Sequence, residues 1–583
     1  MTASSKDESE YDRLIQRFID HEGNALVCGG AGCGKTTAAL RKAALLADKG
    51  LKFKHSKALF LSFANATIDR IAQHAPGIID SSQHWSLALN TYHGFAWAIL
   101  RNHGYLLGAP RNVTILSPGE ENAFRANLND LEPANSDDFI ELFINSGHVS
   151  FDYFAGLANE VLENNPILLK AYADAFPIIF LDEFQDTTDS QWALMKTLGK
   201  HSRLIALGDP DQRIYDHVVG ASPYRFEEFV AEYQLEKIDL SGWNWRSPEG
   251  SITKFGQDVL AGSLEEEYAD VDFIPLDHRP LFRLKGQVLK AIKRLDNAGK
   301  GKSIAILTPS NALSGQVYDF FLEETPPLPK LYLDIHVGKD EAFAASIFVA
   351  TVMQSPDDSN ASLAYLSRAL AHYTRTRSSK FSKSGRDEAE KLDREAVRLD
   401  GGTTRRELKS TTHLRKLLIE SLAKARTGHP LADFLTTVSA ATRSEYGPLA
   451  SLARKTRLVN LITRGGELES HLAHSWRRAG SYEDAERDMR DAVVTYQMQS
   501  AKTGSRDLVV MTIHRAKGRE FEEVFVYEER YQPFVPEKVV DLTSARYAMN
   551  VAVTRARSRA TILTPRSRPS RLFTVDTSSD GQR

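Results

Sequence analysis

The chain has 583 residues, enough for about four domains of ordinary size. A formal net charge of −3 excludes a uniformly basic surface, so any nucleic-acid contact must be confined to a local groove. No run of about eighteen apolar residues predicts a membrane span, and the polar N-terminal stretch has no signal-type segment. Two cysteines, Cys28 and Cys33, are expected to be small buried residues. We therefore expect a protein of the reducing cytoplasm that makes no membrane contact.

The first motif along the chain is a phosphate-binding loop. Residues Gly29–Thr37 read Gly-Gly-Ala-Gly-Cys-Gly-Lys-Thr-Thr, between a strand-type run at Asn24–Cys28 and helix formers at Thr37–Asp48. Glycines allow the chain to wrap an anion, and the helix N-terminus then points backbone N–H groups at a phosphate. Lys35 is expected to reach the β- and γ-phosphates, and the Thr36 hydroxyl to bind magnesium. The alternative is a glycine-rich turn that caps a helix.

Another strand-type run ends in carboxylates. Pro177–Leu181 is wholly apolar, as in a parallel strand covered on both faces, and Asp182 and Glu183 follow it directly. Ligands of such sheets bind at the carboxyl ends of the strands. Asp182 is therefore the expected magnesium ligand, and Glu183 the residue expected to orient or activate water. The alternative interpretation is an ordinary acidic turn.

Two further segments place aromatic residues beside polar ones. Thr91 and His93 flank an aromatic residue just after a strand-type run, which suits either a base-stacking surface or an ordinary core and helix cap. Trp245 and Arg246 belong to a segment with two tryptophans, which suits either an adenine stack with a cation beyond it or a core patch.

Together these motifs resemble those of the superfamily 1 helicases of the UvrD/Rep/PcrA type. Asp182–Thr187 (Asp-Glu-Phe-Gln-Asp-Thr) is identical to the second motif of that family, and Thr91–Phe95 (Thr-Tyr-His-Gly-Phe) matches Thr-Phe-His-Ser-Phe. In the second half, Val509–Val526 contains Thr-x-His-x-Ala-Lys-Gly-x-Glu-Phe, and Asn550–Arg557 matches the last motif. Three more segments match family motifs: Ser62–Ala66, Gly208–Tyr215 and Asn244–Ser247.

The resemblance implies an α/β fold with two RecA-like P-loop NTPase motor domains on parallel sheets, each carrying a mainly helical insertion. The implied boundaries are 1–100 and 176–247 for the first motor domain, 101–175 for its insertion, 248–355 and 506–565 for the second motor domain, 356–505 for its insertion, and 566–583 for a polar tail. The second insertion contains a basic-leaning stretch from Arg375 to Lys416, interpreted either as a solvated helical face or as a contact with duplex DNA or a partner.

The resemblance also implies that ATP, with Mg²⁺, is hydrolysed between the motor domains. Arg246 and Arg555 would reach the γ-phosphate from the far side and stabilise the transition-state charge, and Gln212 would sense that phosphate. Trp245 replaces the family tyrosine that stacks on adenine, and Glu520 would hold the ribose. The implied ATP contacts are Gln16, Gly29, Gly30, Ala31, Gly32, Cys33, Gly34, Lys35, Thr36, Thr37, Trp245, Arg246, Gly518, Glu520 and Arg555.

For the nucleic-acid strand, the resemblance implies a surface of stacking rings, hydroxyls and amides. Its implied residues are Phe63, Asn65, Thr91, His93, Tyr215, His217 and His514. His217 stands where the family has a stacking tryptophan, which predicts a weaker grip on the strand there.

The implied activity is ATP-driven movement from 3′ to 5′ along single-stranded DNA, with unwinding of a tailed duplex. A second hypothesis is an ATP- and DNA-gated subunit that regulates a nuclease or other protein partner, in DNA repair or antiviral defence, with little unwinding. RNA as the track is a third hypothesis.

Overall fold

The computed structural model divides into two compact units, each described by itself. The first unit comprises residues 1–98, 155–337 and 501–583, and the second comprises residues 99–154 and 338–500. The structure describes residues 5–51, 53, 55–63, 68, 71–72, 86–116, 120–121, 124–125, 136–213, 220–235, 237–245, 250–265, 267–299, 301, 303–336, 340–376, 383–402, 407–456, 467–498 and 507–573.

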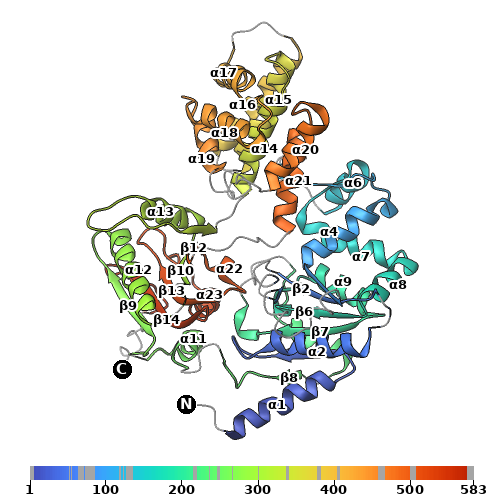
Figure 1. Cartoon of the computed structure of the whole chain (residues 1–583), viewed down its shortest axis with the longest axis vertical. Coiled ribbons are helices and arrows are strands. Elements are labelled where there is room, and N and C mark those ends of the chain that lie inside the picture. The colour runs from blue at the N-terminus through green and yellow to red at the C-terminus, as the bar shows by residue number, and fades with distance from the viewer. Residues whose placement is uncertain are drawn as a thin grey trace, which may run out of the picture. The chain divides into compact units, whose positions relative to one another are not determined.

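The first unit contains two six-stranded parallel sheets (Figure 1), which confirms the predicted α/β class. The first sheet has the order β3-β2-β6-β7-β1-β8. Its strands are β3 (Leu87–Thr91), β2 (Ala58–Ser62), β6 (Ile178–Leu181), β7 (Arg203–Gly208), β1 (Ala25–Cys28) and β8 (Lys237–Asp239). The helices that accompany it are α1 (Ser5–Asp20), α2 (Lys35–Lys49), α4 (Tyr92–His103), α7 (Phe154–Glu163), α8 (Pro166–Ala175), α9 (Asp189–Gly199) and α10 (Arg225–Tyr233).

The phosphate loop follows one of the apolar strands of this sheet. β1 and β6 are buried along their whole length, as the sequence predicts for parallel strands. α1 and α2 pack on one face, where Phe18 and Leu40 join the same core as Phe180. β1 ends at Cys28 and α2 begins at Lys35, so the loop between them lies at the carboxyl edge of the sheet.

The second sheet is also parallel and has the order β11-β12-β10-β13-β14-β9. Its strands are β11 (Asp334–His336), β12 (Leu508–Thr512), β10 (Ile304–Thr308), β13 (Phe521–Tyr527), β14 (Ala556–Pro565) and β9 (Val271–Leu276). The accompanying helices are α11 (Ser251–Ala261), α12 (Pro280–Asn297), α13 (Asn311–Leu322), α22 (Ile513–Ala516) and α23 (Thr543–Val553).

Side chains of the second sheet alternate between two cores. Ala305 and Leu307 of β10 belong to the core that includes α11 and α23, whereas Ile304 and Ile306 belong to the core that includes α12 and α13. This alternation follows from the two-residue period of a strand and shows that both faces are covered.

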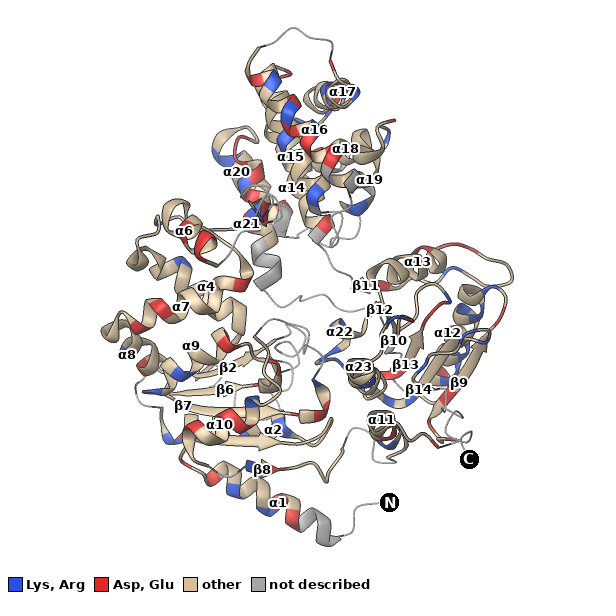
Figure 2. Ribbon diagram, turned by 180° about the vertical axis from the view of Figure 1, so that it is seen from behind, with Lys and Arg blue, Asp and Glu red and all other residues tan. Residues whose placement is uncertain are grey.

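The second unit is mainly helical. Its elements are β4 (Thr114–Ile115), α6 (Ser136–Ser146), β5 (His148–Val149), α14 (Asp340–Gln354), α15 (Asn360–Thr376), α16 (Lys383–Asp400), α17 (Lys409–Lys424), α18 (Pro430–Thr442), α19 (Gly447–Thr456), α20 (Glu467–Ala479) and α21 (Ala485–Met498). One apolar core joins α14 to α21, and acidic and basic residues alternate on the helices around it (Figure 2).

Two arginines of the basic-leaning stretch are paired inside this unit. Arg375 is buried and donates to Asp393, and Arg415 donates from Nε to Glu407 at 2.9 Å. The Arg375 pair joins α15 to α16, and the Arg415 pair joins α17 to the residue two positions before that helix begins. Four other basic residues of the stretch lie outside the described residues: Arg377, Lys380, Arg405 and Arg406.

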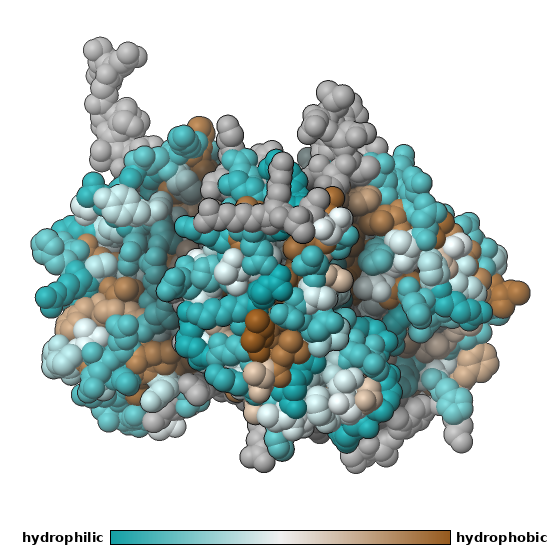
Figure 3. Space-filling view, turned by 90° about the horizontal axis from the view of Figure 1, so that it is seen from above, coloured by the Kyte–Doolittle hydropathy of each residue, from teal (hydrophilic) through white to brown (hydrophobic). Residues whose placement is uncertain are grey.

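The structure also bears on the predictions about membrane spans and about the two cysteines. Among the described residues, no helix is both long and apolar enough to cross a membrane. Hydrophobic residues form small patches separated by hydrophilic ones on the face seen in Figure 3. Cys28 and Cys33 are buried free thiols, as predicted.

Candidate active site

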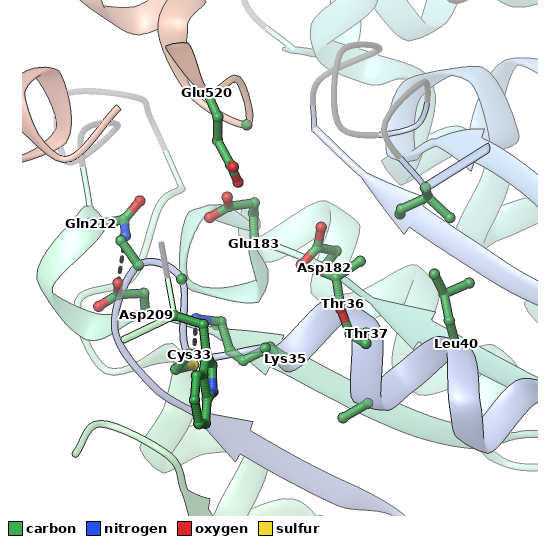
Figure 4. A pocket seen from close by; sticks show the side chains of 18 of the residues that line it. Cys33, Lys35, Thr36, Thr37, Leu40, Asp182, Glu183, Asp209, Gln212 and Glu520 are labelled. Carbon is green, nitrogen blue, oxygen red and sulfur yellow. Dashed lines mark hydrogen bonds between the residues drawn. The ribbon is translucent and has the colours of Figure 1, made fainter. Parts of the chain in front are cut away.

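A pocket of about 630 Å³ lies at the carboxyl end of the first sheet (Figure 4). That volume is in the range of small-molecule sites. Residues of both sheets line it. Those from the first sheet and its helices are Tyr11, Asp12, Ile15, Ala31, Gly32, Cys33, Gly34, Lys35, Thr36, Thr37, Ala38, Leu40, Arg41, Ile71, Asp182, Glu183, Gly208, Asp209, Gln212 and Trp245. Those from the loops of the second sheet and from its strand β14 are Gly518, Glu520, Arg555 and Arg557.

The phosphate loop closes tightly around Lys35. Gly34 has φ 93°, a left-handed conformation that favours glycine, and it precedes the first residue of α2. Lys35 Nζ donates to the carbonyl of Gly29 and, at 3.0 Å, to that of Gly30. Burial by itself lowers the pKa of Lys35, but nearby Cys33 and the carboxylates around the pocket raise it overall. The ammonium therefore stays charged at neutral pH.

An aromatic cluster supports the outer side of the loop. The Tyr11 hydroxyl donates to the Cys33 carbonyl at 2.9 Å, and a Cβ at Gly34 would come within 2.3 Å of that hydroxyl. The Tyr11 ring lies 5.5 Å from Trp243 and 5.4 Å from Trp245. Trp245 is half exposed, and its backbone N–H donates to the Gly32 carbonyl at 2.9 Å. Trp245 therefore presents a ring to the pocket beside the loop.

The structure does not bring Gln16 to this pocket. Gln16 lies on the exposed side of α1, and its amide donates to Asp20 at 2.9 Å. Tyr11, Asp12 and Ile15 of the same helix line the pocket instead. An adenine contact through Gln16 is therefore not supported. Gly29 and Gly30 do not line the pocket either, although their carbonyls hold Lys35.

Asp182 and Glu183 follow β6 at the floor of the pocket. Asp182 is buried, and its side chain lies near Thr36 at the start of α2 (Figure 4). Glu183 has φ 53°, an unusual conformation for a residue with a side chain, and its carboxylate points into the pocket. Gln185 Nε2 donates to Glu183 Oε2 at 2.6 Å, which holds that side chain in one orientation.

Lys517, which follows α22 of the second sheet, reaches two carboxylates of the first sheet, those of Glu183 and Asp186. Its ammonium is buried, pairs with Asp186, and lies 3.5 Å from Glu183 Oε2. It also donates to the Gln212 carbonyl at 2.8 Å. Burial alone raises the pKa of Glu183, but Lys517, Arg555 and Lys35 lower it to about 2. Glu183 is therefore ionised at neutral pH.

A hydrogen-bonded chain joins the two sheets beside this carboxylate. Arg555 is buried and donates from Nη2 to Gln212 Oε1 at 2.6 Å, and Gln212 Nε2 donates to Asp209 Oδ2 at 2.6 Å. Elsewhere in the lining of the pocket, Arg557 Nη2 donates to Glu520 at 3.1 Å. The predicted residues Gln212, Glu520 and Arg555 thus line one pocket with Lys35 and Glu183.

The described residues predicted to contact the nucleic-acid strand lie just after β2, at and just after the end of β3, and on α22 of the second sheet. Phe63 is half-buried and lies 4.8 Å from the Tyr92 ring. Thr91 is buried, and its hydroxyl accepts from the Gly94 N–H at 3.0 Å, which fits the interpretation as a helix cap. His93 is half-buried, and burial lowers its pKa. His514 is exposed on α22.

Four predicted site residues lie outside the described residues: Asn65, Tyr215, His217 and Arg246.

Comparison with protein families gives one result for both halves of the chain. The UvrD/REP helicase N-terminal domain matches residues 14–140 and 134–234, and the UvrD-like helicase C-terminal domain matches residues 413–567. The chain belongs to the UvrD-like helicase family.

Curated relatives bear helicase names. DNA helicase II of Salmonella typhimurium is 22% identical over 634 aligned positions, which cover 95% of this chain and 84% of the relative. DNA helicase II of Haemophilus influenzae is 26% identical and covers 43% of this chain and 40% of the relative. ATP-dependent DNA helicase PcrA of Staphylococcus aureus is 23% identical and covers 52% of this chain and 48% of the relative.

Sequence reasoning missed several residues of the pocket. Tyr11 was visible only as part of an amphipathic helix, and Asp209 and Arg557 only as members of matched motifs. Lys517 stood in the Ala-Lys-Gly motif, but nothing local showed that its ammonium reaches Asp186. Arg41 lies two turns into α2, beyond the loop that the motif defines.

The first prediction concerns the two ion pairs of this site. Lys517→Met is expected to lower the free energy of unfolding by about 3 kcal/mol, because it leaves the buried carboxylate of Asp186 without its cation. Arg557→Met removes a half-exposed partner of Glu520 and is expected to cost less than about 1 kcal/mol. Urea titrations measure the free energy of unfolding of both variants. Equal losses of stability would contradict the conclusion that the buried pair of Lys517 contributes more than the half-exposed pair of Arg557.

Proposed function

We propose that this protein is an ATP-driven DNA helicase that moves from 3′ to 5′ along single-stranded DNA. The main support is that Lys35 and Glu183 from one sheet share a pocket with Arg555 from the other, and that Lys517 of that other sheet lies 3.5 Å from Glu183. The helicase names of the relatives support the same activity. Residues 1–100 with 176–247 and residues 248–355 with 506–565 are the proposed motor domains, with helical insertions at 101–175 and 356–505.

ATP is proposed to bind with its phosphates in the loop and its base near Trp245. The backbone around Gly34 and the N-terminus of α2 suit a polyphosphate, and the Lys35 ammonium supplies the cation. The half-exposed ring of Trp245 suits stacking against a base. Glu520, across the pocket, is proposed to bind the ribose.

The chemistry of the donor set also fits Mg²⁺. This ion takes oxygen ligands and is usually bound by one or two protein groups together with substrate phosphates. The hydroxyl of Thr36 and the carboxylate of Asp182 lie near each other at the start of α2 (Figure 4) and would hold it. When bound, Mg²⁺ neutralises phosphate charge.

Hydrolysis is proposed to use Glu183 as the group that orients water and accepts its proton. Gln185 and Lys517 both contact Oε2, which leaves Oε1 to face the attacking water. Arg555 carries a fixed positive charge and is proposed to stabilise the negative charge that spreads over the transferred phosphoryl group. Gln212 touches Arg555 and is proposed to sense the γ-phosphate.

Movement is proposed to follow from the division of these groups between two sheets. Changes in the pocket during the ATP cycle would draw Arg555 and Lys517 toward or away from Glu183 and alter the strand surface in step. That surface is proposed to include the described residues Phe63, His93 and His514, where bases stack on rings.

The second prediction tests the phosphate and water roles. Lys35→Ala is expected to abolish ATP turnover because the phosphates lose their cation. Glu183→Gln is expected to bind ATP but to lower turnover at least about 100-fold, since the amide cannot accept the proton. Binding of a fluorescent ATP analogue and release of phosphate separate the two effects. A normal rate in Glu183→Gln would refute the proposed role.

The third prediction tests the base contact with a matched pair of tryptophans. Trp245→Ala is expected to raise the ATP concentration for half-maximal turnover about tenfold, because one base–aromatic stack is lost. Trp243→Ala serves as the control, since Trp243 also packs on Tyr11 but does not line the pocket. Equal shifts in both variants would mean that Trp245 acts only through packing.

The fourth prediction distinguishes a motor from a gated binding subunit. A duplex with a 3′ single-stranded tail should be displaced when ATP is present, and one with a 5′ tail should not. ATP turnover stimulated by the tail but without displacement would favour a regulatory subunit of a nuclease or other partner. Comparison of single-stranded DNA and RNA as activators of turnover decides between the two tracks.

A further inference from the structure

Tyr92 is a residue of the first sheet that the proposed reaction does not use. It follows β3 directly, begins α4, and has a buried side chain. The family motif has phenylalanine at this position, so the ring is a shared feature whereas the hydroxyl distinguishes this chain.

Strand order places Tyr92 beside both the strand surface and the metal ligand. β2 lies between β3 and β6, and Ser62 pairs with Thr91 while Leu61 pairs with Leu181. The next residue along each strand is therefore Phe63 after β2, Tyr92 after β3 and Asp182 after β6. All three lie at the carboxyl ends of neighbouring strands.

The ring of Tyr92 packs against the strand surface. Its centroid lies 4.8 Å from that of Phe63, with 41° between the ring planes. A base that stacks on Phe63 would change the position of a ring in direct contact with Tyr92. Because protein interiors are closely packed, such a displacement is passed to the next side chain.

The hydroxyl of Tyr92 reaches the backbone of a residue that lines the pocket. It donates to the backbone carbonyl of Asp182 at 3.2 Å. Burial, together with the negative charges of Asp182, Glu183 and Asp186, raises the pKa of Tyr92 well above its usual range. The phenol is therefore protonated and able to donate, and it lies within electrostatic reach of the carboxylates that the pocket uses.

We propose that Tyr92 is a positioning residue that transmits occupancy of the strand surface at Phe63 to the Asp182 end of β6. Its ring contacts Phe63, and its hydroxyl holds the carbonyl of the residue that would bind Mg²⁺. The inference rests on the proposed function, because it needs both a strand on Phe63 and ATP in the pocket.

The fifth prediction uses Tyr92→Phe, which keeps the ring and restores the residue of the family motif. The factor by which saturating single-stranded DNA raises ATP turnover is expected to fall about fivefold, the usual effect of losing one hydrogen bond. The Mg²⁺ concentration for half-maximal turnover is expected to rise by a similar factor, because the backbone of Asp182 is no longer held. A purely structural role for the hydroxyl would not shift this Mg²⁺ dependence.

Tyr233→Phe provides the matched control. Tyr233 belongs to α10 of the same unit, packs on Trp192 and Phe229, and does not line the pocket. The Tyr233→Phe variant should show the same stimulation of ATP turnover by DNA and the same Mg²⁺ dependence as the protein without substitutions. Anisotropy of a fluorescein-labelled oligonucleotide measures strand binding separately. If Tyr92→Phe matches Tyr233→Phe in both readouts, or if weaker DNA binding accounts for its whole effect, the inference is overturned.

A double variant tests the path itself. If Phe63 and Tyr92 act in series, adding Tyr92→Phe to Phe63→Leu should lower the stimulation little further. Reductions that multiply would show independent effects and overturn the inference. If DNA does not stimulate ATP turnover by the protein without substitutions, this inference is overturned, but the proposed ATP hydrolysis is not. A protein that hydrolyses no ATP at all would overturn the proposed function as well.

Discussion

A buried carboxylate stays ionised only where nearby charges or hydrogen bonds favour the charged form, and beside this pocket two cations come from the opposite sheet. Asp186 and Glu183 follow β6 of the first sheet, whereas Lys517 and Arg555 belong to loops of the second. Without those cations, desolvation would favour protonated carboxylates that could not accept a proton from water. The phosphate loop is built by the first sheet alone, but an ionised Glu183 depends on the second sheet as well.

The same dependence explains the unusual backbone at Glu183. A left-handed conformation costs about 1 kcal/mol or more for a residue with a Cβ, so it persists only where other contacts hold it. At Glu183 those contacts are the hydrogen bond from Gln185 and the nearby charge of Lys517. Together they aim the carboxylate into the pocket instead of leaving it on the solvated surface of a turn.

How much the sequence could predict depends on the range of the interaction. The strands β1 and β6 and the helix after the glycine-rich loop follow from short patterns of glycine, apolar and helix-forming residues, and the structure confirms all three. Gln16 could not be placed so simply, because only the folded structure shows which side chains of one helical turn a pocket includes. Tyr11, Asp12 and Ile15 line the pocket, whereas Gln16, one turn beyond Asp12, is exposed and donates to Asp20.

No local sequence pattern could predict contacts between residues that are far apart in the chain. Lys517 and Asp186 are separated by most of the chain, and only the folded arrangement of the two sheets shows that their charges meet. Thr91 illustrates a different difficulty. A threonine after a strand suits both a phosphate contact and a helix cap, and only its burial and the Gly94 N–H show that its hydroxyl is already used.

On the first sheet, the described residues of the proposed strand surface carry little charge, and this constrains how ATP could act on that surface. Phe63 and Thr91 are uncharged, and burial lowers the pKa of His93 so that it is neutral at pH 7. Neutralisation of backbone phosphates, which makes nucleic-acid binding strongly dependent on salt, therefore cannot be the main contribution of these residues. Stacking on rings remains, and stacking depends on the position and tilt of each ring. A surface of this kind would be altered by small displacements of packed side chains, such as those that we propose Tyr92 passes between Phe63 and Asp182.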